Sequence, residues 1–514
     1  MTDSQRRHSG AIATPHVLAT QAGERAYERG GSAIDAALAA AAVLCVVYPH
    51  NVSIGGDLIA LVRSPDGAVR CINASGPAPH LVDADALRLA HGDELPYRGI
   101  STVTVPGALR GWESLHRMAA ARPWSEIFDD ALDAASGVPV ARSLADAFVT
   151  EGASIAFDPG FLDVFQQHGR FPVRGDLLRQ PALARTLATL QADGADAFYE
   201  GSLTGDFLAG LEGLGSTLSA PDLLLYRPEI VDPIVTDYGP WRVHTSPPNS
   251  QGFALLRVLE YLRDQGVVDP LGTGFGELMQ LFYRANHLRD ERLGDPRSGA
   301  LELDTLLSES SVRNTVVGSG FERPRGDTVG IAAADSTGWS VSLIQSVYHA
   351  FGAGVVEPST GILLHNRGTS FSLRPDSPNL LAPGRRPLHT LMPVIVTEAD
   401  ELRAVSATMG GQGQPQIHAQ VLLRVAAGAS AAEAVTAPRA IVGPQQDGDS
   451  STTLYFEPDL VPEARRSLNE TDLDLRPTPP LSELVGHANL ILVTDDGTFD
   501  AGSDPRADGS ASIE

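Results

Sequence analysis

The chain has 514 residues, 43% of them hydrophobic, and 63 acidic against 38 basic residues give it a formal net charge of −25. A chain of this length can bury a large core and form about two to four domains. The acidic balance argues against nucleic acid or an anionic membrane as a partner, and it is typical of a soluble protein with a solvated acidic surface.

The sequence gives no sign of export or of a membrane span. The first eight residues lead into no hydrophobic signal-peptide core. The longest apolar run, residues 36–47, is too short to cross a bilayer and is predicted to be a buried helix. Cys45 and Cys71 lie in apolar contexts and are expected to be buried thiols rather than a disulfide. We therefore expect a cytoplasmic protein.

The amino-terminal part is predicted to form helices packed on a sheet. Thr14 precedes a proline and is typical of an N-cap, and a glycine pair beginning at Gly30 is predicted to end that helix. Ser32 with Asp35 resembles the capping box of a second helix, which is apolar nearly all round. A strand is expected at residues 59–63 after a glycine turn.

The middle of the chain is predicted to be mostly helical. Helices are expected from Ala108 and over residues 124–135, and the segment 141–292 has helical patterning with glycine and proline punctuation and no residue to which we assign chemistry. The segment 301–327 is polar and rich in Ser, Arg and Gly, which is typical of a mobile stretch where a chain break could occur, or of a plain surface loop.

The main candidate for chemistry is Thr328, at the start of a predicted β-hairpin. The apolar run 329–334, the polar turn 335–338 and the alternating run 339–346 indicate two paired strands. A hydroxyl needs a neighbouring base to act as a nucleophile, and an α-amine has a pKa of roughly 7.7–8.0 against ~10.4 for lysine. If the chain is cut before Thr328, this residue supplies both groups; the alternative is a turn that opens an ordinary strand.

Later elements are short strands and one clear helix. Strands are expected at residues 361–365, 393–397 and 488–493, and a helix at 415–426. The pair Gly410 and Gly411 stands just before this helix, where bare backbone N–H groups can stabilise a developing oxyanion. The alternative for this pair is a flexible turn.

Several of these stretches together resemble the gamma-glutamyltransferase (glutathione hydrolase) family of N-terminal-nucleophile hydrolases. The resemblance covers nearly the whole chain and rests on Gly-Gly-Ser-Ala-Ile-Asp-Ala-Ala at 30–37, Ile-Gly-Gly at 54–56, Gly-Asp-Thr at 326–328 and Ala-Gly-Ser-Asp-Pro-Arg at 501–506. It implies an α+β fold, a four-layer αββα sandwich. It also implies one precursor cut before a threonine into associated chains 1–327 and 328–514, which share one intertwined domain.

The resemblance also implies a catalytic set. Thr328 corresponds to the nucleophile, and Gly410 and Gly411 correspond to the oxyanion hole. Ser346 stands where the family places a threonine that hydrogen-bonds the nucleophile, and serine keeps the hydroxyl; the alternative is an ordinary strand serine. The chain has no Gly-x-Ser-x-Gly, His-Glu-x-x-His, Cys-x-x-Cys or P-loop motif, so we expect neither metal nor cofactor.

The residues predicted to bind substrate depart from the family pattern. The family binds the substrate α-ammonium with a glutamine and an acidic residue, where this chain has Arg367 and Ser370. An arginine repels an ammonium and attracts a carboxylate in bidentate fashion. The family's carboxylate-binding serine pair is replaced by His389 and Thr390, and an asparagine is replaced by Tyr348. Arg367 could instead form a structural ion pair, and His389 could instead satisfy a backbone carbonyl.

These departures resemble the subgroup that includes oxamate amidohydrolases, as do the stretches 366–372, 387–390 and 409–416. We expect a small-molecule amide to be cleaved through an acyl-enzyme on Thr328, with water or an amine as acceptor, and a carboxylate to be held by Arg367. One alternative is a C–C bond hydrolase acting on a 2-oxo acid intermediate in specialised metabolism. Another is an uncleaved, non-catalytic homologue.

Overall fold

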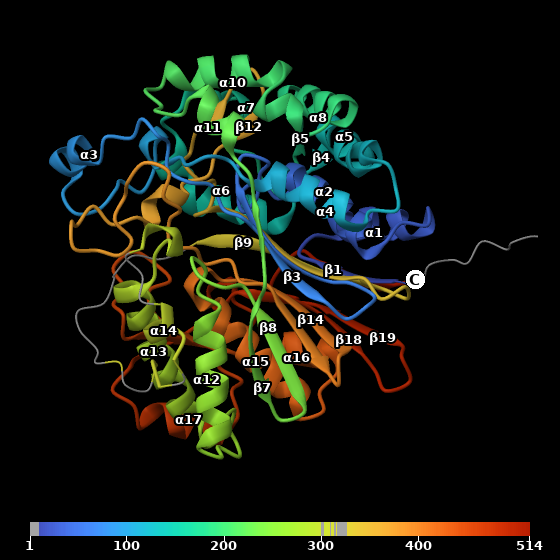
Figure 1. Cartoon of the computed structure of the whole chain (residues 1–514), viewed down its shortest axis with the longest axis vertical. Helices are drawn as coiled ribbons and strands as arrows, with labels where there is room; N and C mark the ends of the chain where they lie inside the picture. Colours follow the sequence, from blue (N-terminus) through green and yellow to red (C-terminus); the bar gives the residue numbers. More distant parts are fainter. Residues whose placement is uncertain (1–9, 300–302, 309, 313–314, 316–325) are drawn as a thin grey trace, which may run out of the picture.

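Two stacked β-sheets form the centre of the molecule, with helices on both outer faces (Figure 1). The computed structural model describes residues 10–299, 303–308, 310–312, 315 and 326–514. Most of the segment 301–327, which was predicted to be mobile, lies outside the described residues.

The first sheet has seven strands, each antiparallel to its neighbours. Their order is β20 (Ser510–Ile513), β1 (Gly10–Thr14), β9 (Asp327–Asp335), β10 (Ser340–Tyr348), β2 (Asp57–Arg63), β3 (Val69–Ala74) and β6 (Glu229–Val231). The predicted hairpin is therefore confirmed as β9 and β10, and it lies at the middle of the sheet between strands from the amino-terminal part of the chain.

The second sheet has six strands, also antiparallel throughout. Their order is β19 (Phe499–Ser503), β18 (His487–Val493), β14 (Glu401–Met409), β13 (Val394–Glu398), β8 (Trp241–Thr245) and β7 (Ile234–Tyr238). Smaller sheets pair β4 (Val138–Pro139) with β5 (Leu177–Leu178), β11 (Val356–Glu357) with β12 (Ile362–Leu363), and β16 (Thr453–Phe456) with β15 (Ala440–Val442) and β17 (Asp474–Pro477).

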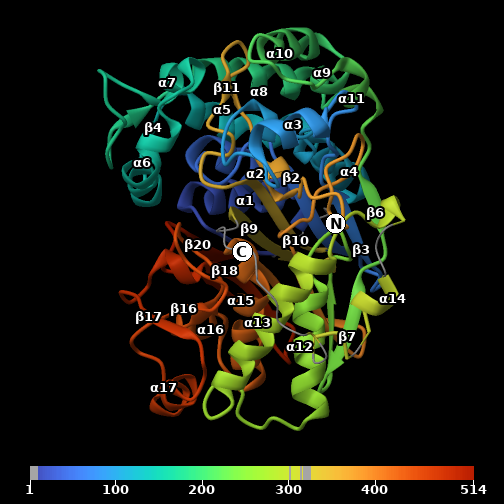
Figure 2. The ribbon, with the colours of Figure 1, turned by 90° about the vertical axis from the view of Figure 1, so that its left-hand side faces the viewer.

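The helices divide between the two outer faces, as the two views in Figures 1 and 2 show. Those on the first sheet's side are α1 (Val17–Glu28), α2 (Ala33–Val47), α4 (Ala108–Ala119), α5 (Asp129–Ser136), α6 (Arg142–Ile155), α7 (Pro159–Phe165), α8 (Pro181–Asp193), α9 (Asp196–Tyr199), α10 (Ser202–Glu212) and α11 (Ala220–Leu225), with α3 (Ala84–His91) at one edge. Those on the second sheet's side are α12 (Phe253–Asp264), α13 (Phe275–Arg292), α14 (Leu303–Leu306), α15 (Gln414–Ala426), α16 (Ala431–Thr436) and α17 (Pro462–Asn469).

Three hydrophobic clusters separate these four layers. One lies between the first sheet and its helices, one between the two sheets, and one between the second sheet and its helices. Burying a large apolar side chain contributes roughly 1.5–3 kcal/mol, so each cluster holds a pair of layers together. The predicted four-layer αββα sandwich is confirmed.

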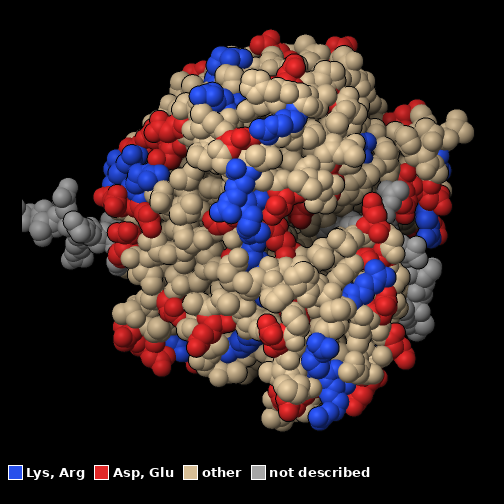
Figure 3. All heavy atoms as spheres, turned by 180° about the vertical axis from the view of Figure 1, so that it is seen from behind, with Lys and Arg blue, Asp and Glu red and all other residues tan. Residues whose placement is uncertain are grey.

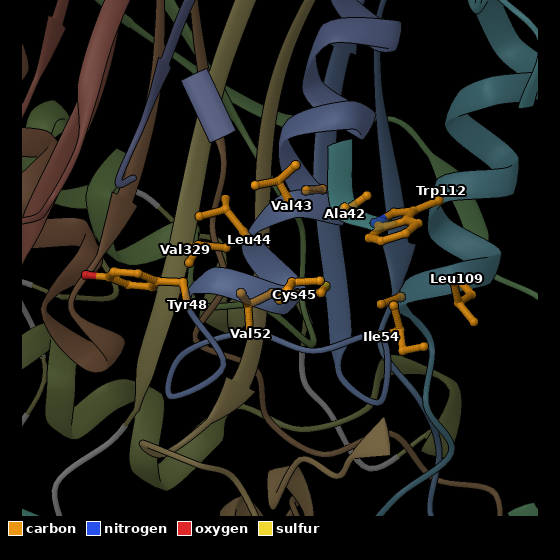
Figure 4. Close-up of a cluster of buried hydrophobic side chains, with 14 of the residues drawn as sticks. Ala42, Val43, Leu44, Cys45, Tyr48, Val52, Ile54, Leu109, Trp112 and Val329 are labelled. Atoms are coloured by element: carbon orange, nitrogen blue, oxygen red, sulfur yellow. The ribbon is translucent and has the colours of Figure 1, made fainter. Parts of the chain in front are cut away.

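Helix α2 fixes the start of β9. All of its residues are buried, and the predicted capping box of Ser32 and Asp35 is present at its start. In Figure 4, Val329 of β9 lies near Leu44 and Tyr48 of this part of the chain, within the same cluster. Because side chains alternate along a strand, Thr328 faces the opposite way, toward the second sheet.

The two sheets pack tightly against each other at Gly330 of β9. A Cβ built there would lie 2.6 Å from the carbonyl carbon of Ala407 and 2.7 Å from the nitrogen of Thr408, so only glycine fits. On the neighbouring strand β10, Ser342 donates from Oγ to the carbonyl of Ser406 at 2.7 Å. Ser342 is opposite Ala332 of β9 in the register, so Ser406 lies at the level of Ala332, and Thr408 lies at the level of Gly330. Strands β9 and β14 therefore run in opposite directions, which brings the end of β14 to the start of β9.

One local prediction, at Thr14, was wrong. Thr14 ends strand β1 and donates from Oγ1 to the carbonyl of His16, which is itself the N-cap of α1. The segment 141–292 is mostly helical, as predicted, and it also contains the short strands β6, β7 and β8. Two of these strands lie at sheet edges with partly exposed residues, so a continuous apolar run does not mark them.

Three features that were predicted from the composition can be compared with the structure, namely the surface charge, the apolarity of the helices and the state of the cysteines. On the face drawn in Figure 3, acidic and basic side chains are interspersed rather than gathered into a field of one sign. Of the helices described, none combines the length and the apolarity that crossing a bilayer requires. Cys45 and Cys71 are both buried and free, as predicted.

Candidate active site

The candidate site lies where three neighbouring strands of the first sheet meet at one end. Strand β9 begins there with Asp327, β10 has Ser346 two residues before its end at Tyr348, and β2 begins there with Asp57, which is directly opposite Ser346 in the register. A bulge in β10 then brings Tyr348 opposite Asp327. Bulges commonly redirect a side chain beside a functional site, and here the bulge turns Ser346 toward the start of β9.

The peptide bond between Asp327 and Thr328 is held by two hydroxyl groups. Thr328 is fully buried, and its Oγ1 donates to the carbonyl oxygen of Asp327 at 2.6 Å. Ser346 Oγ donates to the same oxygen, also at 2.6 Å. The backbone N–H of Tyr348 donates to Ser346 Oγ at 2.7 Å, so the hydroxyl proton of the serine is directed at the carbonyl. The carbonyl is therefore polarised in the intact chain.

The side chain of Asp327 is in an unfavourable place for a negative charge. Burial, together with the nearby carboxylates of Glu151 and Glu483, raises the pKa of Asp327 to about 7, although Arg98 acts in the opposite direction. At neutral pH this carboxyl group is therefore divided between its protonated and its charged form. Cutting the chain after Asp327 would add a second carboxylate to the same surroundings.

The two glycines predicted to stabilise an oxyanion lie where β14 ends. Gly410 has φ 147° and Gly411 has φ 50°, and a Cβ on Gly410 would lie 2.5 Å from Ile417 Cδ1. Both residues therefore need to be glycine. Because the end of β14 lies beside the start of β9, the turn faces the same region as Thr328. Gln251 fixes this turn by donating from Nε2 to the carbonyl of Gly411 at 2.9 Å.

Arg367 is fully buried beside Tyr348, the residue opposite Asp327 in the register. It begins the short helix η4 (Arg367–Ser370), and its guanidinium carbon lies 3.8 Å from the ring centroid of Tyr348. Its Nη1 donates to Thr390 Oγ1 at 3.3 Å. Tyr348 has φ 83°, a conformation that the bulge imposes and that places its ring under the arginine. The guanidinium of Arg367 stacks on the ring of Tyr348, and Tyr348 is opposite Asp327 in the register. The ring of Tyr348 therefore lies between the cation and Asp327.

Asp57 is the buried counter-charge of this region. Its Oδ2 lies 3.1 Å from His389 Nε2, 3.4 Å from His365 Nδ1 and 3.9 Å from Arg367 Nε. Its Oδ1 accepts the backbone N–H of Gly76 at 2.9 Å. Burial raises the pKa of Asp57, but the two histidines outweigh it and hold the pKa well below the usual range. Asp57 is therefore ionised.

His389 is neutral. Burial and the charge of Arg367 lower its pKa to about 3, against the pull of Asp57. The backbone N–H of Leu391 donates to Nδ1 at 3.3 Å, so Nδ1 carries a lone pair and Nε2 carries the proton that faces Asp57. Both nitrogens of the ring are thus used within the protein.

Six residues predicted from the sequence share this region, namely Thr328, Ser346, Tyr348, Arg367, His389 and Thr390. Gly410 and Gly411 lie in the same region because the end of β14, which they follow, is beside the start of β9. The hydroxyl of Ser370 instead lies 2.9 Å from the carbonyls of Arg367 and Leu388, to which it donates, so in this structure it braces the loop of η4.

Sequence reasoning missed three polar residues of the site. Asp57 follows the glycine turn at the start of β2, and its position next to a recognised motif was the available signal. His365 stands directly before the stretch 366–371 that drew attention to Arg367. Gln251 lies in the segment to which no chemistry was assigned, and nothing local marks it. Among the described residues, no group of three or more His, Cys, Asp or Glu side chains is placed to hold a metal ion.

Comparison with known proteins bears on both the fold and this site. The chain is 34% identical to the oxamate amidohydrolase proenzyme of Klebsiella pneumoniae subsp. pneumoniae, over 98% of each chain. It is 32% identical to the glutathione hydrolase-like YwrD proenzyme of Bacillus subtilis, over 97% of each. The crystal structure of cephalosporin acylase from Bacillus halodurans superimposes with a TM-score of 0.88 at 32% identity, over 99% of this chain and 97% of that one.

A family model also matches most of the sequence. The profile of the gamma-glutamyltranspeptidase family matches residues 19–514, which includes every residue of the site described above. Together with the four-layer sandwich, this match shows that the chain is an enzyme of the gamma-glutamyltranspeptidase family, within the N-terminal-nucleophile hydrolases.

Proposed function

We propose that the chain cuts itself between Asp327 and Thr328 and then hydrolyses a small amide that carries a free carboxylate. The observation that carries this proposal is the carbonyl of Asp327, which accepts hydrogen bonds from Thr328 Oγ1 and Ser346 Oγ at 2.6 Å each. An ordinary strand has no need of two buried hydroxyls on one carbonyl. A nucleophile beside a polarised carbonyl is the arrangement that peptide scission requires.

The self-cleavage follows from these contacts. Thr328 Oγ1 attacks the carbonyl carbon of Asp327 and loses its proton, while the carbonyl electron pair moves onto the oxygen that Ser346 stabilises. The C–N bond then breaks, the nitrogen of Thr328 takes up a proton, and an ester joins Asp327 to Thr328 Oγ1. Water hydrolyses this ester, which leaves a carboxylate on Asp327 and a free amine and hydroxyl on Thr328.

The same threonine then acts on substrate. Its α-amine accepts the hydroxyl proton as Oγ1 attacks the substrate carbonyl, and the N–H groups of the Gly410–Gly411 turn stabilise the oxyanion. The amine leaving group takes the proton and departs, and an acyl-enzyme remains. Water, activated by the same amine, attacks the acyl carbon and restores Thr328.

Arg367 sets the substrate class. A gamma-glutamyl group presents an α-ammonium, which a buried guanidinium repels, whereas a carboxylate forms a bidentate pair with it. Arg367 lies on the ring of Tyr348, the residue opposite Asp327, so a short acid would reach from the guanidinium to the nucleophile. The similarity to an oxamate amidohydrolase proenzyme supports a substrate whose carboxylate is bonded to the amide carbon.

We also propose that the two chains stay associated after the cut. Strands β9 and β10 follow the cut yet lie between β1 and β2, which precede it. Separating the chains would therefore break the middle of the first sheet. A cytoplasmic location is likewise proposed, and fractionation of cells producing the protein tests it.

A substrate panel tests the proposed function. The purified, processed enzyme is offered oxamate, a gamma-glutamyl anilide and a 2-oxo acid at equal concentration, and ammonia, aniline and C–C cleavage products are measured. We expect oxamate or a related carboxylate-bearing amide to turn over at least ~10-fold faster than the anilide. Strong anilide turnover would contradict the role of Arg367, and C–C cleavage alone would favour the rival chemistry. A single uncut, inactive chain would favour the non-catalytic homologue.

A further inference from the structure

Two buried histidines near the start of β9 have both ring nitrogens unpaired. His50 follows α2 and is 3% exposed, and His487 begins β18 and is fully buried. Among the residues that the structure describes, none forms a hydrogen bond with their four ring nitrogens or with Asn51 Oδ1. Buried polar groups are nearly always paired, and leaving one unpaired costs about 1–3 kcal/mol. Several unpaired atoms in neighbouring side chains therefore point to a bound group.

The direction of the strands places His487 at the level of Thr328. Asn489 donates from Nδ2 to the carbonyl of Gly330 at 2.8 Å, so this face of β18 lies against β9. Strand β14 is antiparallel to β18 as well as to β9, so β18 and β9 run in the same direction. Two residues back along each strand are His487 and Thr328. Residues two apart share a face of a strand, so His487 faces the first sheet while Thr328 faces the second.

The loop after α2 brings His50 and Asn51 to the same region. Asn51 donates from Nδ2 to the carbonyl of Thr328 at 3.4 Å. Its own carbonyl accepts the N–H of Val347 at 3.0 Å, which fixes the loop to β10. His50 is close enough to His487 for the charge of one ring to affect the pKa of the other.

Both rings are neutral at pH 7. Burial, with a smaller contribution from His487, lowers the pKa of His50 to about 3, and burial lowers the pKa of His487 to about 4. A neutral imidazole has one N–H and one lone pair, so the two rings together offer two donors and two acceptors. Asn51 Oδ1 is a third acceptor, because Nδ2 of this amide is directed at a carbonyl. Acceptors outnumber donors, so a group that completes these hydrogen bonds must itself donate hydrogen.

We propose that His50, Asn51 and His487 bind the water molecule that hydrolyses the ester on Thr328. A buried water makes about three hydrogen bonds to groups that would otherwise be unpaired, and it donates as well as accepts. This role rests on the function proposed above, because the ester forms only if Thr328 is the nucleophile. It applies to the ester of self-cleavage and to the acyl-enzyme alike.

The two histidines and the substrate residues lie on different sides of β9. Strand β18 packs against β9 and β1. Arg367 instead stacks on Tyr348 of β10, which pairs with the other edge of β9. A water held by the histidines therefore reaches Thr328 from a direction that a substrate bound to Arg367 leaves open.

The bound water supplies the oxygen of the new acid. This oxygen bonds to the ester carbon while one proton of the water passes to the amine of Thr328. The bond from the ester carbon to Oγ1 then breaks, and Oγ1 takes the proton from the amine. The acid releases the remaining proton, which leaves a carboxylate and the free threonine. The histidines orient the water and keep their own protons.

Cleavage of the native precursor by hydroxylamine tests this role. Under mild conditions hydroxylamine cleaves esters but not peptide bonds, so it cuts the chain only once Thr328 Oγ1 carries Asp327, and it leaves a hydroxamate on Asp327. His487→Phe keeps a ring and removes both nitrogens, so we expect self-cleavage to slow at least ~10-fold and added hydroxylamine to restore cutting. His487→Gln keeps a donor and an acceptor and should cut within about threefold of the wild-type rate.

His287→Phe is the matched control. His287 is 2% exposed, its ring nitrogens also have no partner among the described residues, and it lies on α13, on the outer side of the second sheet. This variant should cut at the wild-type rate. If the melting profile shows that His487→Phe has not folded, His50→Phe takes its place with the same expected results.

The outcomes separate this role from the proposed function. A wild-type rate in His487→Phe, an equal loss in His287→Phe, or a slow His487→Phe that hydroxylamine does not cut would each overturn the water site while self-cleavage of the wild type stands. A wild-type chain that neither cuts itself nor is cut by hydroxylamine would contradict both proposals.

Discussion

Replacing Ser346 with alanine removes one of the two hydroxyl donors to the carbonyl of Asp327. In the intact chain this donor lies 2.6 Å from the oxygen on which negative charge develops as Thr328 attacks. The loss of one oxyanion donor slows a reaction by about 10²–10³-fold, or about 2.7–4 kcal/mol. We therefore expect Ser346→Ala to slow self-cleavage by about two to three orders of magnitude.

The same substitution also affects stability, which a control must separate from the chemistry. Without Ser346 Oγ, the N–H of Tyr348 loses its acceptor, at a cost of about 1–3 kcal/mol. Ser342 on the same strand is a matched control because it is equally buried, donates to the carbonyl of Ser406 and accepts the N–H of Val394. Ser342→Ala should cost similar stability and leave the cleavage rate unchanged.

A pulse of labelled precursor made in a cell-free system, followed by denaturing gels over time, gives the first-order rate of cleavage. Ser346→Thr, which restores the hydroxyl, should cleave within about tenfold of the wild-type rate. The reasoning is refuted if Ser346→Ala cuts within about threefold of wild type, or if Ser342→Ala is slowed as much as Ser346→Ala.

Three further predictions concern recognition, packing and pH. Arg367→Lys keeps the charge but loses the planar guanidinium, which can form a bidentate pair and stacks on Tyr348. KM for a carboxylate substrate should therefore rise ~10-fold or more in steady-state assays, and an unchanged KM would contradict carboxylate binding by Arg367. Gly330→Ala pushes a methyl group against the backbone of β14 and should cost about 1–3 kcal/mol in urea unfolding, whereas Gly205→Ala, which meets nothing within 4 Å, should cost none. Because the pKa of Asp327 is raised to about 7 in the folded chain, its contribution to the stability of the uncut Thr328→Ala precursor is complete below about pH 4 and is lost as pH rises through 7. Unfolding measured at pH 5 and pH 8 should show a loss of about 2–3 kcal/mol that Asp327→Asn abolishes. An equal loss in both precursors would contradict the assignment.

Much of the fold could be predicted because its strongest determinants are local. The hairpin of β9 and β10 follows from two apolar runs around a polar turn, and α2 follows from its capping box and its continuous apolar sequence. Thr14 was misassigned because the proline after it suits a helix start, whereas pairing with β20 extends the strand to this residue. Pairing with a distant strand is not encoded in the neighbouring residues.

The residues of the candidate site also fall into those with a local sequence signature and those whose roles depend on distant segments. Thr328 and the glycine pair could be proposed as candidates because strand starts and glycine turns have local signatures and because a family resemblance covered them. Asp57 and His365 could not, because their roles depend on each other and on Arg367, which lies on a different segment from Asp57 and meets it only in the folded chain. Gln251 joins the turn at Gly411 from a third segment. Charge and tautomer in such a cluster depend on burial and on partners that the sequence order conceals.

The absence of lysine gives a direct test of the liberated amine. The sequence contains no lysine, so residues 328–514 hold no primary amine unless the chain is cut before Thr328. Acetylation with a ¹³C-labelled N-hydroxysuccinimide ester, followed by intact mass and peptide mapping, should find a chain that begins at Thr328 with its amine label on that residue alone. Because an amide nitrogen is not basic, activity should fall in proportion to the labelling. An uncut or unlabelled chain, or full activity after complete acetylation of the Thr328 amine, would contradict the claim that this amine serves the threonine hydroxyl.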